Sequence, residues 1–307
     1  MVSDAPFALL FPGQGTEAVG MSTGWDGHPD WREVVATAET RSGFDLEAWM
    51  REGPESELRA PRQAPYAVVA HSVGLFRAHR AAGMPLPRVA TGHSLGFYSA
   101  VVAAGVVSLE AVLELVDAVE DASAQAFGPG THGMAFVIGL SERELREALE
   151  GQPDLALSNL NGRAQFTVSG PRPALETLLE AVQGRALKCG LLPVQHPLHG
   201  PHMVPLVPSL ARRLAAWKPR DPEFPLLSHA TGALLTTGAA CWDEALVSVA
   251  LPVCWVPVAS AVRAQVEAAF ECGHGAQLAN LTRWAERTLA VKSLQDPAAL
   301  AAWGAAG

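Results

Sequence analysis

The sequence has little charge, and this scarcity already excludes one class of protein. Only 17% of its 307 residues are charged, against about 25% in an average globular protein, while 49% are hydrophobic. An intrinsically disordered chain has the opposite balance, so we expect a folded protein with a substantial core. The length is typical of two domains, or of one large domain that carries an insertion.

Positive charge is the scarcer sign. Lysine and arginine number 22 against 31 aspartates and glutamates, which gives a net charge of −9. Nucleic-acid-binding proteins normally carry a basic stripe, and anionic membrane surfaces attract basic segments. We therefore expect neither nucleic acid nor a membrane as a partner.

Cysteine is also scarce. The four cysteines are far apart and form no CxxC pair. They are therefore expected to be free thiols in a reducing compartment. The first residues show no basic segment followed by an apolar one, and the longest uncharged run contains His93, serines and glycines that lipid disfavours. These features predict a cytoplasmic protein.

Short apolar runs alternate with helical periodicity in the first part of the chain. Residues 7–11 and 87–91 are typical of buried strands, and residues 64–82 and 97–104 of helices. Such alternation favours an α/β fold in which a parallel sheet has helices on both faces, as in hydrolases.

A second pattern begins near residue 133. We expect strands at 134–140, 155–157, 164–168 and 186–194, and helices at 141–149 and 173–182, the first opened by a capping box of Ser141 and Glu144. The order βαββαβ is that of a ferredoxin-like unit. The sequence thus predicts a large domain of residues 1–128 and 195–307 and an inserted subdomain of residues 129–194.

One motif points to nucleophilic catalysis. Gly92-His93-Ser94-Leu95-Gly96 fits G-x-S-x-G between a predicted strand and a predicted helix, where a tight turn exposes the serine hydroxyl at a helix N-terminus. A serine nucleophile needs a base, normally histidine. The segment from residue 195 to 202 offers three candidates, His196, His199 and His202; because prolines interrupt it and no acid lies nearby, we expect no metal there.

Several spaced motifs together resemble one family. Residues 11–15 (FPGQG), 92–96 (GHSLG), 159–161 with 165–170 (NLN, QFTVSG), 192–199 (LPVQHPLH), 252–255 and 270–275 occur in the order found in malonyl-CoA:acyl-carrier-protein transacylases and in the acyltransferase domains of polyketide synthases. The resemblance covers nearly the whole chain.

The resemblance implies a role for particular residues. Ser94 is similar to the acyl-accepting nucleophile, and His199 to a general base that a backbone carbonyl near Leu251 orients without a triad acid. The N–H groups of Gln14 and Leu95 resemble an oxyanion hole. The implied reaction is ping-pong, with acyl groups carried on CoA or phosphopantetheine, an acyl-carrier protein as partner and no bound cofactor.

The expected acyl pocket departs from the family pattern. Its substrate-binding residues would be Gln63, His93, Phe97, Val119 and Leu198. Val119 stands where the transacylases have an arginine that pairs with the malonyl carboxylate, on an apolar helix stripe from which Glu120 and its acidic neighbours are expected to point away. A buried carboxylate beside Val119 would lack a partner, which favours a non-carboxylated acyl group. A malonyl transacylase in which Arg163 substitutes as the carboxylate clamp is the alternative.

Three other functions stay open at this point. A thioester hydrolase that edits carrier proteins would use the same Ser94 and His199, with water as acceptor. An ordinary α/β-hydrolase esterase or a non-catalytic carrier-docking module fits the motifs less well. Since carrier proteins are acidic, docking to this acidic chain requires a local basic patch, for which the candidates are Arg163, Arg185, Lys188, Arg283 and Arg287.

Overall fold

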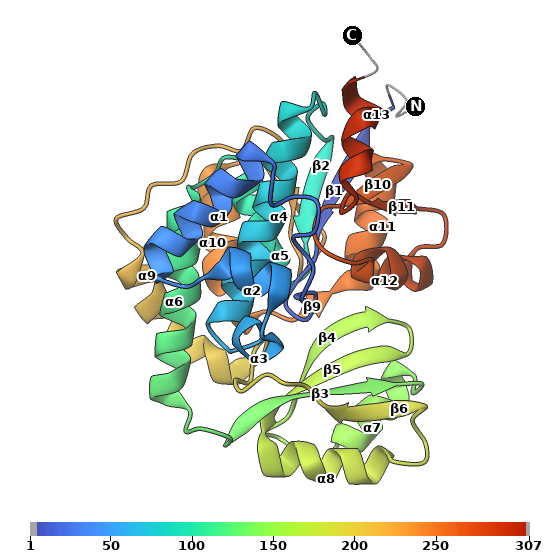
Figure 1. Cartoon of the computed structure of the whole chain (residues 1–307). Coiled ribbons are helices and arrows are strands. Elements are labelled where there is room, and N and C mark those ends of the chain that lie inside the picture. Colours follow the sequence, from blue (N-terminus) through green and yellow to red (C-terminus); the bar gives the residue numbers. More distant parts are fainter. Residues whose placement is uncertain (1–4, 305–307) are drawn as a thin grey trace.

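Two β-sheets organise the chain in the computed structural model, which describes residues 5–304 (Figure 1). The larger sheet has the strand order β11-β10-β1-β2-β7-β8, and all its strand pairs are parallel except β7 with β8. Its strands are β1 (Phe7–Phe11), β2 (Val89–Gly92), β7 (Leu226–Leu227), β8 (Leu234–Leu235), β10 (Ala268–Glu271) and β11 (Ala290–Ser293). The predicted hydrolase-like α/β class is confirmed.

Strand β1 is buried on both faces. Phe7, Leu9 and Phe11 belong to one hydrophobic core, while Ala8 and Leu10, which point to the opposite face, belong to another. A continuous apolar run is the pattern of a parallel strand covered by helices on both sides. The strand begins and ends at the residues that the sequence predicts.

Helices cover the two faces of this sheet. The larger core includes residues of α1 (Pro29–Ser42), α2 (Leu46–Glu52), α3 (Glu55–Leu58), α4 (Gln63–Ala81), α5 (Gly96–Ala103), α6 (Leu109–Ala126), α9 (Val207–Arg213), α10 (Gly238–Val247) and α13 (Ala301–Gly304). The smaller core includes residues of α11 (Trp255–Gln265) and α12 (Gln277–Ala285). Three short 3₁₀ helices complete the path of the chain: η1 (Pro201–Leu206), η2 (Ser248–Ala250) and η3 (Pro297–Leu300).

The second sheet lies below the first in Figure 1 and forms a small subdomain. Its elements follow the predicted βαββαβ order: β3 (His132–Ile138), α7 (Glu142–Leu149), β4 (Ala156–Gly162), β5 (Gln165–Pro171), α8 (Arg172–Val182) and β6 (Lys188–Leu191). Both bonds of the predicted capping box are present, since Ser141 caps the Glu144 N–H and Glu144 reaches back to the Ser141 N–H. Residues of this subdomain form a third core of their own.

One strand crosses the predicted domain boundary. The order of the small sheet is β6-β3-β5-β4-β9, and β9 (Val253–Cys254) pairs in parallel with β4. The assignment of residues 195–307 wholly to the larger domain is therefore wrong at β9, because a two-residue strand leaves no periodicity in the sequence. No helix in the described part of the chain combines the length and hydropathy that a bilayer span requires.

Candidate active site

Ser94 occupies a tight turn between β2 and α5. Its φ of 53° lies in the left-handed region, which a non-glycine residue adopts only under constraint. The flanking glycines make the turn: a Cβ on Gly92 would overlap the backbone of Gly96, and a Cβ on Gly96 would overlap the Phe11 carbonyl. The G-x-S-x-G spacing thus reflects close packing of this turn against the end of β1.

His199 faces Ser94 from a distant segment. Its Nε2 lies 2.6 Å from the Ser94 Oγ, and its Nδ1 lies 2.9 Å from each of the Ser248 and Leu251 carbonyl oxygens. Because a carbonyl oxygen only accepts, Nδ1 carries the proton and Nε2 presents a lone pair to the Ser94 hydroxyl. The backbone N–H of His199 also donates to the Val249 carbonyl at 2.6 Å, so η2 and its C-terminal neighbour hold the ring and its backbone together.

Burial keeps this histidine neutral. Desolvation lowers the pKa of His199 to about 4, although its two carbonyl partners oppose the shift and nearby His93 adds to it. A lowered pKa keeps the imidazole unprotonated near neutral pH, the form that accepts a proton. No carboxylate hydrogen-bonds to His199 within residues 5–304, so backbone carbonyls take the orienting place of a triad acid.

A cavity opens beside the serine and the histidine. Its lining includes the two residues that are expected to form an oxyanion hole. These are Gln14, which follows β1, and Leu95, at the N-terminus of α5. The lining residues are Gln14, Pro61, Pro65, Ser94, Leu95, Tyr98, Val116, Val119, Glu120, Pro193, Val194, Gln195, His196, Leu198, His199, Ser248 and Val249. Among these described residues there is no lysine or arginine.

Helix α6 supplies one wall of the cavity. Val116, Val119 and Glu120 line it, at the i, i+3 and i+4 spacing of one helix face. The expectation that Glu120 points away from the pocket is wrong. Glu120 was expected to point away from the apolar stripe together with Asp117 and Asp121, whereas its side chain lines the cavity, is only 22% exposed and lies 3.1 Å from His196 Nε2.

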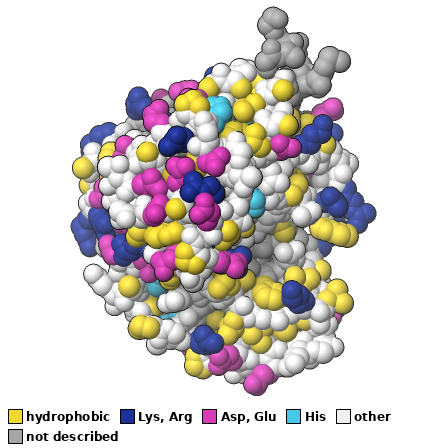
Figure 2. Space-filling view, in the orientation of Figure 1, with side chains coloured by type: hydrophobic (Ala, Val, Ile, Leu, Met, Phe, Trp, Pro, Cys, Tyr) yellow, Lys and Arg dark blue, Asp and Glu magenta, His cyan; other side chains and the backbone are white. Residues whose placement is uncertain are grey.

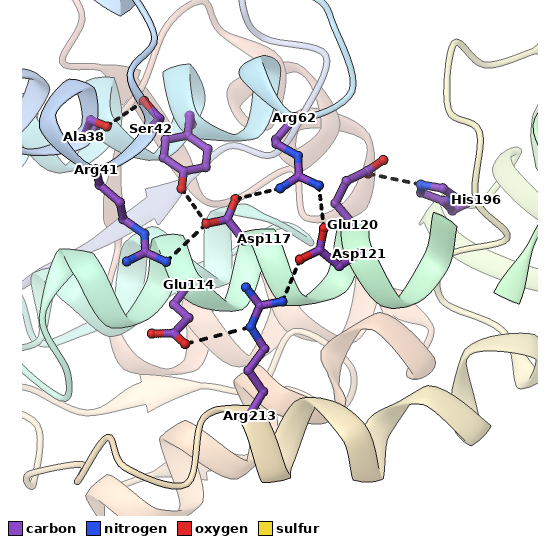
Figure 3. Close-up of polar contacts among 11 residues, drawn as sticks. Ala38, Arg41, Ser42, Arg62, Glu114, Asp117, Glu120, Asp121, His196 and Arg213 are labelled. Carbon is purple, nitrogen blue, oxygen red and sulfur yellow. Dashed lines mark hydrogen bonds and ion pairs between the residues drawn. The ribbon is translucent and has the colours of Figure 1, made fainter. Parts of the chain in front are cut away.

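Figure 3 shows Glu114, Asp117 and Asp121 of α6 in a network with three arginines from separate segments of the chain. Arg62, which precedes α4, binds Asp117 at 3.4 Å and Asp121 at 2.6 Å. Arg41 of α1 binds Asp117 at 3.1 Å, and Arg213 of α9 binds Asp121 at 2.7 Å. These arginines are thereby directed to α6 carboxylates and not to the cavity.

Of the remaining residues predicted to bind the acyl group, some line the cavity and others do not. Leu198 lines the cavity, but Gln63, His93 and Phe97 are not among its lining residues. His93 is buried with its Nε2 2.7 Å from the Asn161 Oδ1, and Phe97 is fully buried with its ring against His229. His93 joins the catalytic turn to the small subdomain, and Phe97 belongs to the core. Contact of these three residues with an acyl group stays a prediction.

Two neighbours of the site were missed in the sequence. His229 is fully buried with its ring centroid 5.9 Å from that of His199, and neither of its ring nitrogens has a hydrogen-bond partner among residues 5–304. No motif marks it. Glu120 could have been found, because it directly follows Val119 and shares a helix face with Val116.

The three clustered histidines have different partners. His199 meets Ser94, His196 meets Glu120, and His202 Nε2 lies 2.8 Å from the Asp154 carbonyl oxygen. They do not converge on one point in the described structure, so this segment does not assemble a common ligand set.

The candidate docking residues are all exposed, and two of them share a second cleft. Arg163, in the β4–β5 turn, and Arg287, beyond α12, line it together with two exposed apolar side chains, Leu187 (86% exposed) and Trp284 (65% exposed). Figure 2 shows lysine and arginine side chains on both sides of the hollow between the two parts of the molecule. Arg185, Lys188 and Arg283 are exposed nearby in sequence but do not line the cleft.

Comparison with known proteins gives one consistent result. The acyl transferase domain family matches residues 8–276. Malonyl CoA-acyl carrier protein transacylases from Salmonella typhimurium and Escherichia coli K12 are 33% and 34% identical to this chain, each over 96% of this chain and 98% of the relative. A solved acyl-carrier-protein S-malonyltransferase from Burkholderia pseudomallei superposes with a TM-score of 0.90 at 30% identity, covering 97% of this chain and 98% of that one. A malonyl-transacylase solved in complex with its type II polyketide synthase acyl-carrier protein superposes with a TM-score of 0.90 at 29% identity. The match covers 99% of this chain and 100% of that one.

Proposed function

This chain belongs to the acyl transferase domain family and is an acyltransferase, and from this premise we propose that Ser94 carries the acyl group with His199 as its general base. The observation that carries the proposal is the 2.6 Å contact between the Ser94 Oγ and the His199 Nε2. It places a hydroxyl and a neutral imidazole in the geometry of base-assisted attack.

The proposed reaction has two halves. In the first, the Ser94 Oγ attacks the carbonyl carbon of an acyl thioester while His199 Nε2 takes the hydroxyl proton, the C–S bond breaks, and the leaving thiolate takes that proton from His199. In the second, an incoming thiol gives its proton to His199 and attacks the Ser94 ester, and the Ser94 oxygen recovers the proton as it leaves. The N–H groups of Gln14 and Leu95 are proposed to stabilise the oxyanion in both halves.

We further propose that the acyl group has no free carboxylate. Val119 and Glu120 line the cavity, and no lysine or arginine does so within the described chain. A malonyl carboxylate would enter beside the Glu120 carboxylate without a cationic partner, which is costly in a partly buried site. Arg163, the alternative clamp, is exposed and lines the second cleft instead.

Labelling of the intact protein tests this proposal. Malonyl-CoA and butyryl-CoA are offered separately, and the acylated fraction is followed by intact mass, with Ser94→Ala as the control that forms no adduct. We expect butyryl to label the protein faster. Faster labelling by malonyl would show that the chain shares the substrate named for its malonyl transacylase relatives.

The acceptor is proposed to be the thiol of an acyl-carrier protein. The related malonyl-transacylase solved with an acyl-carrier protein supports this, and so do the exposed arginines at the second cleft, which suit an acidic partner. Acylated enzyme mixed with a holo-carrier protein should yield acyl-carrier faster than free acid. Free acid as the main product would instead identify a thioester hydrolase.

A further inference from the structure

Two residues of the cavity lining have backbone N–H groups without a hydrogen-bond partner. These are Gln14 and Leu95, and neither N–H donates to another residue in the described part of the chain. Leu95 directly follows Ser94 in the catalytic turn. The Gln14 segment packs against the same turn, because a Cβ added to Gly13 would overlap the His93 carbonyl. Two unpaired donors beside a nucleophile match what a developing oxyanion requires.

The Gln14 N–H lies in a segment with glycine on both sides. Gly13 precedes Gln14, and Gly15, which has a φ of 96°, follows it. Glycine allows the adjoining peptides to rotate at little steric cost. Other contacts must therefore fix the direction of the Gln14 N–H.

Two side chains of this segment hydrogen-bond to the peptides on either side of Gln14. The Thr16 Oγ1 donates to the Gly13 carbonyl oxygen at 2.8 Å, and the Gly15 N–H donates to the Glu17 Oε2 at 2.7 Å. Glu17 is buried, so its carboxylate is held in place by the surrounding chain. The Glu17 bond fixes the peptide that follows Gln14, and the Thr16 bond fixes the peptide that precedes it.

The Thr16 bond acts on the peptide that carries the oxyanion donor. The Gly13 carbonyl and the Gln14 N–H belong to one planar trans peptide, so they point in opposite directions. A donor that fixes the carbonyl therefore also fixes the direction of the N–H. Because hydrogen bonds in series polarise one another, the same bond strengthens the N–H as a donor.

We propose that Thr16 is a positioning residue of the oxyanion hole, whose hydroxyl keeps the Gln14 N–H directed at the oxyanion that forms when Ser94 attacks a thioester. Thr16 does not line the cavity, so it acts through the Gly13–Gln14 peptide and not by contact with the acyl group. The oxyanion forms in both halves of the reaction, so the Thr16 hydroxyl should matter in both. This inference rests on the proposed Ser94 acyl-enzyme and its oxyanion hole.

Removal of the hydroxyl tests the inference. Thr16→Val keeps the shape of the side chain, and the donor is whichever of butyryl-CoA and malonyl-CoA labels the wild-type protein faster. We expect the maximal single-turnover acylation rate constant to fall about tenfold or more, while the half-saturating thioester concentration changes less than about twofold. Transfer of the acyl group from Ser94 to free pantetheine should slow by a similar factor.

Three further variants separate positioning from a general loss of stability. Thr16→Ser keeps the hydroxyl and should restore both rate constants to within about threefold of the wild-type values. Thr16→Ala also lacks the hydroxyl and repeats the test without a second methyl group. Thr40→Val is the matched control, because the Thr40 hydroxyl donates to the Ala36 carbonyl at 2.8 Å on α1 and does not line the cavity. It should leave both rate constants unchanged, and thermal unfolding establishes which variants are folded.

The possible outcomes distinguish this inference from the proposed function. Wild-type rate constants in folded Thr16→Val or Thr16→Ala would overturn the inference. So would a loss that Thr16→Ser does not restore, or one confined to the half-saturating concentration. A wild-type protein that acquires no acyl group on Ser94 would instead contradict the proposed acyl-enzyme itself.

Discussion

Ser94 and His199 meet at 2.6 Å, and both hold a backbone conformation that L-residues rarely adopt, with φ of 53° and 62°. Each is fixed by backbone instead of by a charged side chain. The Ser94 turn packs against the end of β1, and the His199 ring is held by the Ser248 and Leu251 carbonyls. The dyad is therefore positioned by close backbone contacts within the larger domain.

The pH dependence of acylation follows from the burial of His199. Its pKa is lowered from 6.5 to about 4, so the neutral base persists as the pH falls and is lost only near pH 4. We expect the single-turnover acylation rate constant to change little between about pH 8 and pH 5.5. Circular dichroism at each pH controls for unfolding. A tenfold fall per pH unit beginning near 6.5 in folded protein would show that His199 titrates as an exposed histidine.

Gly96→Ala tests the close packing of the catalytic turn. The added Cβ would overlap the Phe11 carbonyl, and backbone on both sides leaves no flexible side chain to move. We expect a loss of at least about 2 kcal/mol in the free energy of unfolding, measured with denaturant, together with slower acylation. Gly27→Ala is the matched control, because nothing lies within 4 Å of its added Cβ. Equal stability of the two variants would refute the packing argument.

Val119→Arg should increase acylation by malonyl-CoA, since it places a guanidinium in the cavity wall where a carboxylate would otherwise lack a partner. We expect a gain of about tenfold or more in the single-turnover rate constant with malonyl-CoA. Val119→Met lengthens the same side chain without charge and should give no gain. A gain with Met equal to that with Arg would mean that shape, and not charge, governs the pocket.

Arg287→Glu at the second cleft should slow transfer to a carrier protein while small thioesters still acylate Ser94 normally. The exposed Arg287 lines the cleft, so reversing its charge repels an acidic partner, and the effect should shrink as salt is added. Arg143→Glu on α7 reverses an exposed charge that does not line this cleft and should have little effect. Equal slowing by both variants would place docking elsewhere.

Much of the fold was predictable because its signals are local. The apolar run of β1, the glycines around Ser94 and the capping box of α7 each depend on a few adjacent residues. The position of His199 opposite Ser94 came from a family resemblance, because 105 residues separate them. No local pattern reveals such a contact.

The expectations that the structure corrects concern features without a local signal in the sequence. Periodicity placed Val119 on the apolar stripe of α6 and directed Glu120 away from it, because the partner of Glu120, His196, is 76 residues away in the sequence. Phe97 was expected in the acyl pocket, yet its ring packs against His229. No sequence motif indicates that His229 is buried. β9 joins the small sheet through only two residues, which is too short for a pattern.

The most direct test of the account is a competition for Ser94. The protein is mixed briefly with equimolar malonyl-CoA and butyryl-CoA, and the adduct is weighed on the intact chain and mapped to its residue. The account predicts a butyryl ester on Ser94 as the dominant product. A dominant malonyl ester on Ser94 would contradict it.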